Sequence, residues 1–248
     1  MYGPIFYTAG HTDALIRAEA ILRKQGCQFA SAPDLSVTHL LLDVPSFSAD
    51  GNLRCGGSLN DILPFLSPQV KICGGFLDGH VPDGYQTIDL LADPFYVAEN
   101  ARITAHCATA LAMQKLPCIL FGCPVLIIGW GRIGKCLGSL LKNMGARVTI
   151  AARKVSDRAM LEALGYDTLN TGGLAYSLAR FRLVFNTAPE LILPAQAMAY
   201  APKDCIKIDL ASMPGIDGSD VIQARGLPGK DAPESSATLI AQTLLRLR

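Results

Sequence analysis

The stretch LIIGWGRIGKCLGSLL, residues 126–141, decides the fold of this chain. It opens with an apolar run typical of a buried parallel strand, and it ends with leucines at helical spacing. Between them, Gly129, Gly131 and Gly134 form the pattern G-x-G-x-x-G. Between a strand and a helix, this pattern favours a dinucleotide site. The first glycine permits a tight turn, the second lets the backbone approach a pyrophosphate, and the third lets the helix pack on the strand.

The residues around this turn also predict which dinucleotide binds. Arg132 and Ile133 begin the helix, where backbone amides face the phosphates. Arg153 ends the next predicted strand, residues 146–153, and Lys154 follows it. A carboxylate at this point would bind the ribose hydroxyls of NAD, whereas two cations suit the 2′-phosphate of NADP. We therefore predict NADP as the cofactor. An ordinary solvated basic loop is the alternative.

Strands and helices alternate along the rest of the second half. The predicted strands are 124–129, 146–153, 166–170, 182–189 and 205–212, and the predicted helices are 133–144, 157–165, 172–181 and 194–201. The first half repeats the pattern more loosely, with strands at 4–10, 37–45 and 70–76 and helices at 12–25 and 58–66. The polar, glycine-rich loop at residues 53–57 has no assignment. Such alternation is typical of doubly wound parallel sheets.

We predict an α/β protein of two doubly wound domains. A smaller, flavodoxin-like N-terminal domain (1–92) would bind the substrate or a partner. A helical segment (93–117), with a possible break near Asn100, leads to a Rossmann NAD(P)-binding domain (118–230). By analogy with related folds, a C-terminal helix (231–248) packs back on the first domain.

Composition excludes several classes of function. The chain has 248 residues, half of them hydrophobic, and its 22 basic and 21 acidic residues leave a net charge of +1. Without a basic block, nucleic-acid binding is not expected. No secretory signal is evident, and the longest apolar stretch is too short to span a bilayer, so we expect a cytoplasmic protein. The eight cysteines form no C-x-x-C pair, which predicts reduced thiols and no metal site.

Further cofactor contacts are expected where later strands end, because ligands bind at the carboxyl ends of parallel strands. The strands 182–189 and 205–212 each end in such a turn, and a third segment, 226–229, lies nearer the C-terminus. Plain strand-to-loop turns are the alternative. The predicted contacts are Asn186, Thr187, Pro189, Asp209, Ser212 and Pro228.

The second half also resembles the family of the A-type subunits of dipicolinate synthase. The resemblance is carried by GWGRIG (129–134), GARVTIAAR (145–153), FNTAPELIL (185–193), IDLASMPGIDGSD (208–220) and GLPGKDAPESSA (226–237). It covers the chain well from about residue 93 onward, and the first ninety residues in outline. The layout is more distantly similar to D-2-hydroxyacid dehydrogenases and to shikimate dehydrogenase.

The resemblance implies a function in sporulation. A member would use NADP to oxidise a dihydrodipicolinate-level intermediate to dipicolinate, together with the flavoprotein-like B-type subunit of dipicolinate synthase. The chain departs from the family pattern at three positions. His106 and Cys107 stand where the family has glutamate and glycine, and Glu234 stands where it tends to have lysine. The first domain is also shorter.

This oxidation needs a base and groups that hold carboxylates. His106 is the candidate base, because histidine titrates near neutral pH, and Arg102, four residues earlier, is the candidate carboxylate contact. A partly buried histidine and a solvated arginine are the alternatives. Because the candidates for catalysis are few, two other functions stay open. One is a non-catalytic NADP-binding subunit of a partner enzyme, and the other is an NADP-dependent dehydrogenase of another small carboxylic acid. The sequence is compatible with a homo-oligomer.

Overall fold

Two separate parallel sheets organise the chain in the computed structural model, which describes residues 3–247. The first compact unit holds the described residues up to Asn100 together with those from Pro228 onward, and the second is Ala101–Leu227. The division falls inside helix α2 (Pro94–Lys115) and at the start of α5 (Leu227–Asp231). The sequence-based boundaries at residues 93, 118 and 231 lie some residues away from it.

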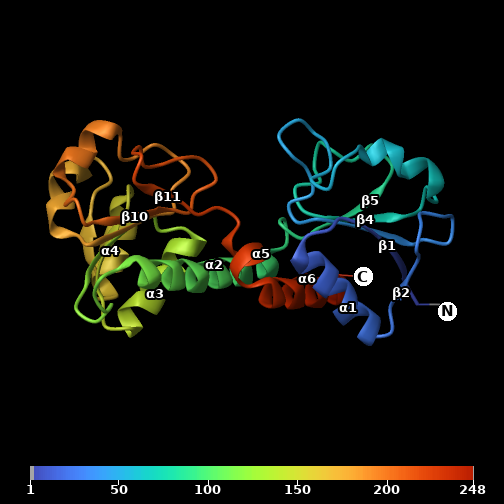
Figure 1. Cartoon of the computed structure of the whole chain (residues 1–248), viewed down its shortest axis with the longest axis horizontal. Coiled ribbons are helices and arrows are strands. Elements are labelled where there is room, and N and C mark those ends of the chain that lie inside the picture. The colour runs from blue at the N-terminus through green and yellow to red at the C-terminus, as the bar shows by residue number, and fades with distance from the viewer. Residues whose placement is uncertain (1–2, 248) are drawn as a thin grey trace. The chain divides into compact units, whose positions relative to one another are not determined.

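The first unit contains a five-stranded sheet in the order β2-β1-β3-β4-β5. Its strands are β1 (Ile5–Ala9), β2 (Gln28–Phe29), β3 (His39–Leu42), β4 (Lys71–Gly74) and β5 (Gln86–Asp89). All neighbouring strands pair in parallel, and the 2-1-3-4-5 order is that of flavodoxin-like folds. Helix α1 (Asp13–Lys24) packs beside α6 (Pro233–Leu247) (Figure 1). The predicted flavodoxin-like class of this domain is confirmed.

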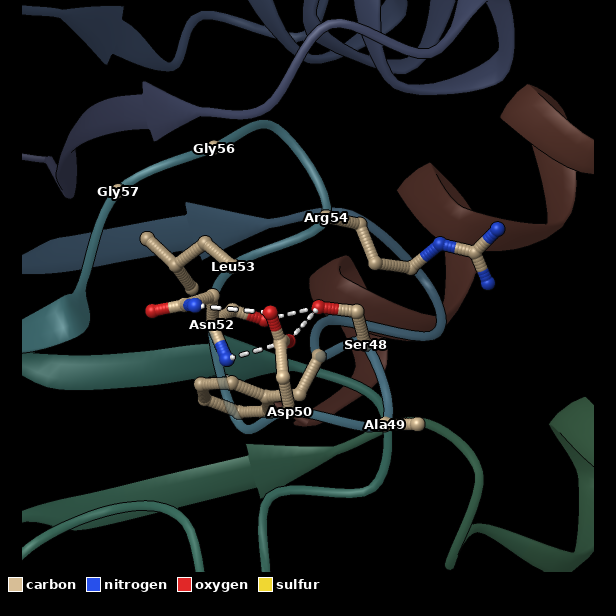
Figure 2. A pocket seen from close by; sticks show the side chains of 9 residues that line it. Ser48, Ala49, Asp50, Asn52, Leu53, Arg54, Gly56 and Gly57 are labelled. Atoms are coloured by element: carbon tan, nitrogen blue, oxygen red, sulfur yellow. Dashed lines mark hydrogen bonds between the residues drawn. The ribbon is translucent and has the colours of Figure 1, made fainter.

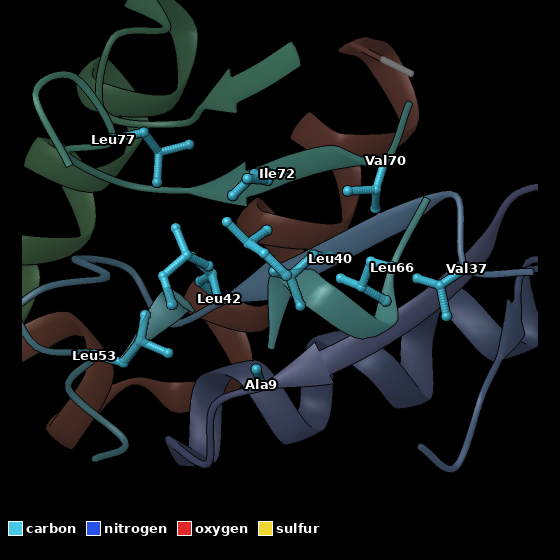
Figure 3. Packing of buried hydrophobic residues seen from close by; sticks show 11 residues of the cluster. Ala9, Val37, Leu40, Leu42, Leu53, Leu66, Val70, Ile72 and Leu77 are labelled. Atoms are coloured by element: carbon cyan, nitrogen blue, oxygen red, sulfur yellow. The ribbon is translucent and has the colours of Figure 1, made fainter. Parts of the chain in front are cut away.

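The core of the first unit is an apolar cluster on its sheet (Figure 3). Leu40 and Leu42 of β3 belong to this cluster together with Ile72 of β4, and the two leucines share a face because they are two residues apart along one strand. Leu53 belongs to this cluster and is only 3% exposed, although it lies in the glycine-rich loop for which no structure could be predicted.

The second unit contains a six-stranded parallel sheet in the order β11-β10-β9-β6-β7-β8. Its strands are β6 (Pro124–Ile128), β7 (Arg147–Ala151), β8 (Asp167–Leu169), β9 (Leu183–Asn186), β10 (Ile206–Asp209) and β11 (Val221–Gln223). Counted from β6, this is the 3-2-1-4-5-6 order of Rossmann folds, with its reversal point between β6 and β9. The predicted Rossmann domain is therefore confirmed. Helices α3 (Arg132–Asn143) and α4 (Val155–Ala163) connect the first three strands.

Several elements differ from the sequence prediction. The expected break near Asn100 is absent, because residues 95–115 contain neither glycine nor proline and continue as one helix, α2. The helices predicted at 172–181 and 194–201 are 3-10 helices, Leu174–Arg180 and Ala195–Tyr200. The helix predicted at 58–66 is two short 3-10 turns, Leu59–Asp61 and Leu63–Phe65, with a proline early in the second. Within residues 3–247, no helix is both long and apolar enough for a membrane crossing.

Candidate dinucleotide-binding site

The glycine turn between β6 and α3 has the geometry that a dinucleotide site requires. Gly129 has a φ of +101°, and a Cβ there would lie 2.6 Å from Thr187 Oγ1. A Cβ on Gly134 would overlap the carbonyl oxygen of Gly129, so this glycine permits the close contact of helix and strand. A Cβ on Gly131, in contrast, would meet nothing within 4 Å. The second glycine therefore faces open space while the other two are fixed by packing.

The first turn of α3 adds a donor surface to this space. Gly131 is the N-cap residue in an extended conformation, and no side chain caps the helix. The first amides of a helix have no intrahelical acceptor, and the helix dipole favours an anion at this end. Arg132 is exposed and Ile133 half-buried at the same end. An uncapped helix start facing open space fits a phosphate group.

The comparable turn of the first unit is occupied by the chain itself. Gly10 follows β1, and a Cβ there would lie 2.9 Å from the carboxylate of Asp43. Asp43 is buried and accepts hydrogen bonds from the Thr12 hydroxyl (2.7 Å), the Thr12 amide (3.2 Å) and the His11 amide (3.4 Å). A carboxylate already takes the place that a phosphate would need. The two strand–glycine–helix turns are therefore not equivalent, and only that of the second unit is open.

The segment after β7 carries the predicted cations. Arg153 lies two residues beyond the strand and is exposed, as is Lys154, the N-cap residue of α4. The guanidinium of Arg158 donates to the carbonyl oxygens of Ala152 and Arg153, at 2.8 Å each, and so holds this segment against α4. Arg153 Nη1 also lies 3.4 Å from Glu190 Oε2. Glu190, which the sequence analysis did not single out, puts a competing anion beside the predicted phosphate contact.

Two predicted contacts, the last residues of β9 and β10, lie in the interior. Asn186 and Asp209 are fully buried, and Asn186 Nδ2 donates to Asp209 Oδ1 at 2.9 Å. The Asp209 carboxylate also accepts the backbone amides of Ala211 (3.1 Å), Gly215 (2.7 Å) and Ile216 (3.2 Å). Through these bonds the side chains of Asn186 and Asp209 hold the loops that follow β9 and β10. A ligand would meet the loops that this pair holds, rather than the two side chains.

The remaining strand-end residues occupy different environments. Thr187 is half-buried, and its hydroxyl donates to the carbonyl oxygen of Ile128 at 2.9 Å, which ties β9 to the glycine turn. Pro189 and Ser212 are exposed. Pro228 is buried in α5 and belongs to the first unit, whereas the sequence-based boundaries put it in the cofactor domain.

The candidate catalytic residues lie together on helix α2. Arg102 and His106 are both exposed and four residues apart, so they share a helix face. Cys107 is 7% exposed, as expected of a thiol that packs in the interior. In the part of the chain that the structure describes, no cluster of histidine, cysteine or acidic residues could hold a metal ion.

The two sheets and the open glycine turn together give the chain a dehydrogenase-like α/β fold. An L-alanine dehydrogenase structure matches 98% of this chain and 80% of its own length, with a TM-score of 0.66 and 14% identity. No protein-family model matches the chain. The fold alone thus gives a class of architecture but no particular activity.

The comparisons of sequence and of structure together confirm the resemblance to the A-type subunit of dipicolinate synthase. The chain is 27% identical over 156 residues to that subunit from Bacillus subtilis (strain 168), across 60% of this chain and 52% of the relative. The match thus spans about half the length of the curated relative. The crystal structure of the same subunit from Bacillus halodurans matches all of this chain and 98% of its own, with a TM-score of 0.85 and 19% identity.

Proposed function

We propose that this chain is an NADP-dependent oxidoreductase that converts a dihydrodipicolinate-level intermediate to dipicolinate, as the A-type subunit of a dipicolinate synthase. It would act in the cytoplasm during sporulation, beside the flavoprotein-like B-type subunit. The observation that carries the proposal is the open, uncapped glycine turn at the β6–α3 junction, in a chain similar in sequence to the A-type subunit.

The second unit supplies the cofactor contacts in this proposal. The amides from Gly131 to Gly134 bind the pyrophosphate, and Thr187 keeps their turn in place through its bond to the Ile128 carbonyl oxygen. Arg153 and Lys154 bind the 2′-phosphate. Asn186 and Asp209 act as positioning residues, because they hold the loops after β9 and β10.

Aromatising a dihydropyridine ring removes one hydride and one proton. When bound, the nicotinamide of NADP accepts the hydride. The chain must accept the proton and hold two substrate carboxylates. We assign the proton to the His106 imidazole and one carboxylate to Arg102, since both side chains are exposed on one face of α2.

A second candidate function is a non-catalytic NADP-binding subunit that positions or regulates its partner. One observation favours it. Among residues 3–247 the structure gives the His106 imidazole no hydrogen-bond partner, whereas a catalytic base is usually oriented by a third group.

An assay with and without the partner separates the two. The full-length chain is mixed with freshly prepared dihydrodipicolinate and NADP, alone and with the B-type subunit of a dipicolinate synthase, and NADPH and dipicolinate are measured together. We expect slow turnover alone and equal amounts of both products with the partner. The His106→Ala variant in the same mixture is the control for the second candidate, because a non-catalytic subunit would keep full activity without this imidazole.

A further inference from the structure

The glycine-rich loop of the first unit belongs to a longer segment, residues 47–57, that is held by packing and by backbone hydrogen bonds, and the whole segment is called the loop below. It follows β3, and Leu53 anchors it in the apolar core. Phe47 and Leu53 form an antiparallel bridge, and the Arg54 amide donates to the Ser46 carbonyl oxygen at 2.9 Å. Arg54 therefore extends from a segment that packing and backbone bonds hold in one conformation.

The loop lies over the reversal point of the first sheet. In the order β2-β1-β3-β4-β5, this point is between β1 and β3, whose chain connections leave in opposite directions. Cys55 Sγ donates to the carbonyl oxygen of Ala9, the last residue of β1, at 3.6 Å, and Leu53 packs in one cluster with Ala9 and Leu42. Ligands of doubly wound sheets bind at this place, outside the carboxyl ends of the strands.

An open hollow of about 760 Å³ is bordered by this loop, including Phe47, Asp50 and Arg54 (Figure 2). The hydrogen bonds of Asp50 go to neighbouring loop side chains and not to Arg54. The Asp50 carboxylate accepts the Ser48 hydroxyl (2.5 Å) and the Asn52 side-chain amide (2.9 Å), and these bonds lower the pKa of Asp50 to about 2. Figure 2 shows Arg54 extending away from this network. In the described residues its guanidinium has neither an ion pair nor a hydrogen bond to another side chain.

Aromatic side chains border the same place. Phe47 and Ser48 also line a second hollow of about 470 Å³, which Phe76 and His80 share. The Phe47 and His80 rings stack with centroids 4.5 Å apart. Phe76 is 62% exposed and has a φ of +58°, which is strained for a non-glycine residue, and its amide is held by Asp89 at 3.2 Å. A strained backbone that keeps an aromatic ring in solvent is typical of functional sites.

We propose that this loop is a carboxylate-binding subsite for a small planar ring compound. Arg54 would bind the carboxylate, and the half-buried ring of Phe47 and the exposed ring of Phe76 would contact the ligand's ring. Arginine presents planar paired donors that match a carboxylate. The ring dicarboxylate as ligand class rests on the proposed function, but the subsite itself rests on the loop and on the neighbouring Phe76.

The test is a titration of pyridine-2,6-dicarboxylate into the full chain labelled with ¹⁵N, followed by NMR. The amide signals of residues 47–57 should shift, and Arg54→Gln should weaken binding about tenfold or more. Phe76→Ala should weaken pyridine-2,6-dicarboxylate but leave the weaker binding of glutarate, which has no ring, unchanged. Arg23→Gln is the matched control. Arg23 is ion-paired to Glu19 and lies in the last turn of α1. Because α1 runs back from the carboxyl end of β1, its last turn lies toward the amino ends of the strands, away from the loop.

Two results would overturn the subsite: unshifted loop signals at saturating dicarboxylate, or equal affinity in the wild-type chain and Arg54→Gln. Failure of the proposed function is a separate result. A chain whose loop signals shift with dicarboxylate, yet which forms no NADPH with its partner, keeps the subsite and loses the reaction.

Discussion

Replacing Arg153 with alanine should remove most of the preference for NADP over NAD. A charge-assisted hydrogen bond to the 2′-phosphate contributes about 1.5–3 kcal/mol, which corresponds to a preference of about ten- to hundredfold. The Arg153 side chain is 76% exposed, so solvent and salt bring the value toward the lower figure. The affinity for NAD should barely change, because NAD lacks the phosphate.

A substitution of Glu190 should change the NADP affinity in the opposite direction. Its carboxylate lies 3.4 Å from Arg153 and competes with a phosphate for the same guanidinium. An exposed pair of this kind is worth about 0–1 kcal/mol, so Glu190→Gln should raise the NADP affinity by up to about fivefold. NAD binding should again stay the same. Opposite effects of the two variants on one ligand are hard to obtain from a general loss of folding.

Titration calorimetry of each variant with NADP and NAD measures these changes. Arg182→Ala is the matched control, since it also removes an exposed arginine that pairs with a carboxylate, that of Asp204. Arg182 precedes β9 and thus lies at the amino end of the sheet, away from the glycine turn. Equal affinities of the unmodified chain for the two cofactors would refute the reasoning about the segment after β7.

Three further predictions concern the glycine turn, the candidate base and acid stability. Gly131→Val should reduce NADP affinity, measured by calorimetry, by about tenfold or more with little change in Tm. Gly134→Ala places a Cβ against a carbonyl oxygen, so thermal unfolding should show an unfolding free energy lower by about 1–3 kcal/mol. His106→Ala should lower steady-state turnover by roughly a hundredfold at unchanged cofactor affinity. A change in turnover below about threefold would mean that His106 is a surface histidine without a role in catalysis. The Arg246 guanidinium, 2.6 Å from Asp93, holds the pKa of that carboxyl below its usual value. The ionised Asp93 carboxylate therefore stabilises the fold fully above about pH 4, and this contribution is lost as the pH falls through the lowered pKa. In Asp93→Asn, Tm should therefore decrease less between about pH 4 and lower pH than it does in the unmodified chain.

The Rossmann turn could be predicted from the sequence because its determinants are adjacent along the chain. Three glycines, an apolar strand before them and a helix after them each have a local physical reason. The same local pattern around Gly10 gave no sign that its turn is filled. Asp43, which fills it, directly follows β3 and reaches the turn only through the pairing of β1 and β3.

The strands that the sequence analysis missed, β2, β5 and β11, all lie at sheet edges. An edge strand is less buried, so it lacks the continuous apolar run that marks the central strands. At the candidate site, the predicted side chains of Asn186 and Asp209 bond to each other across β9 and β10. Contacts between strands depend on register, which no local motif encodes.

The most direct test of the central claim is a crystal structure of this chain with NADP bound. We expect the pyrophosphate to lie against the amides at the start of α3, beside Gly131, and the 2′-phosphate to lie at Arg153. A cofactor bound elsewhere, or with its 2′-phosphate turned away from Arg153 and Lys154, would contradict this claim.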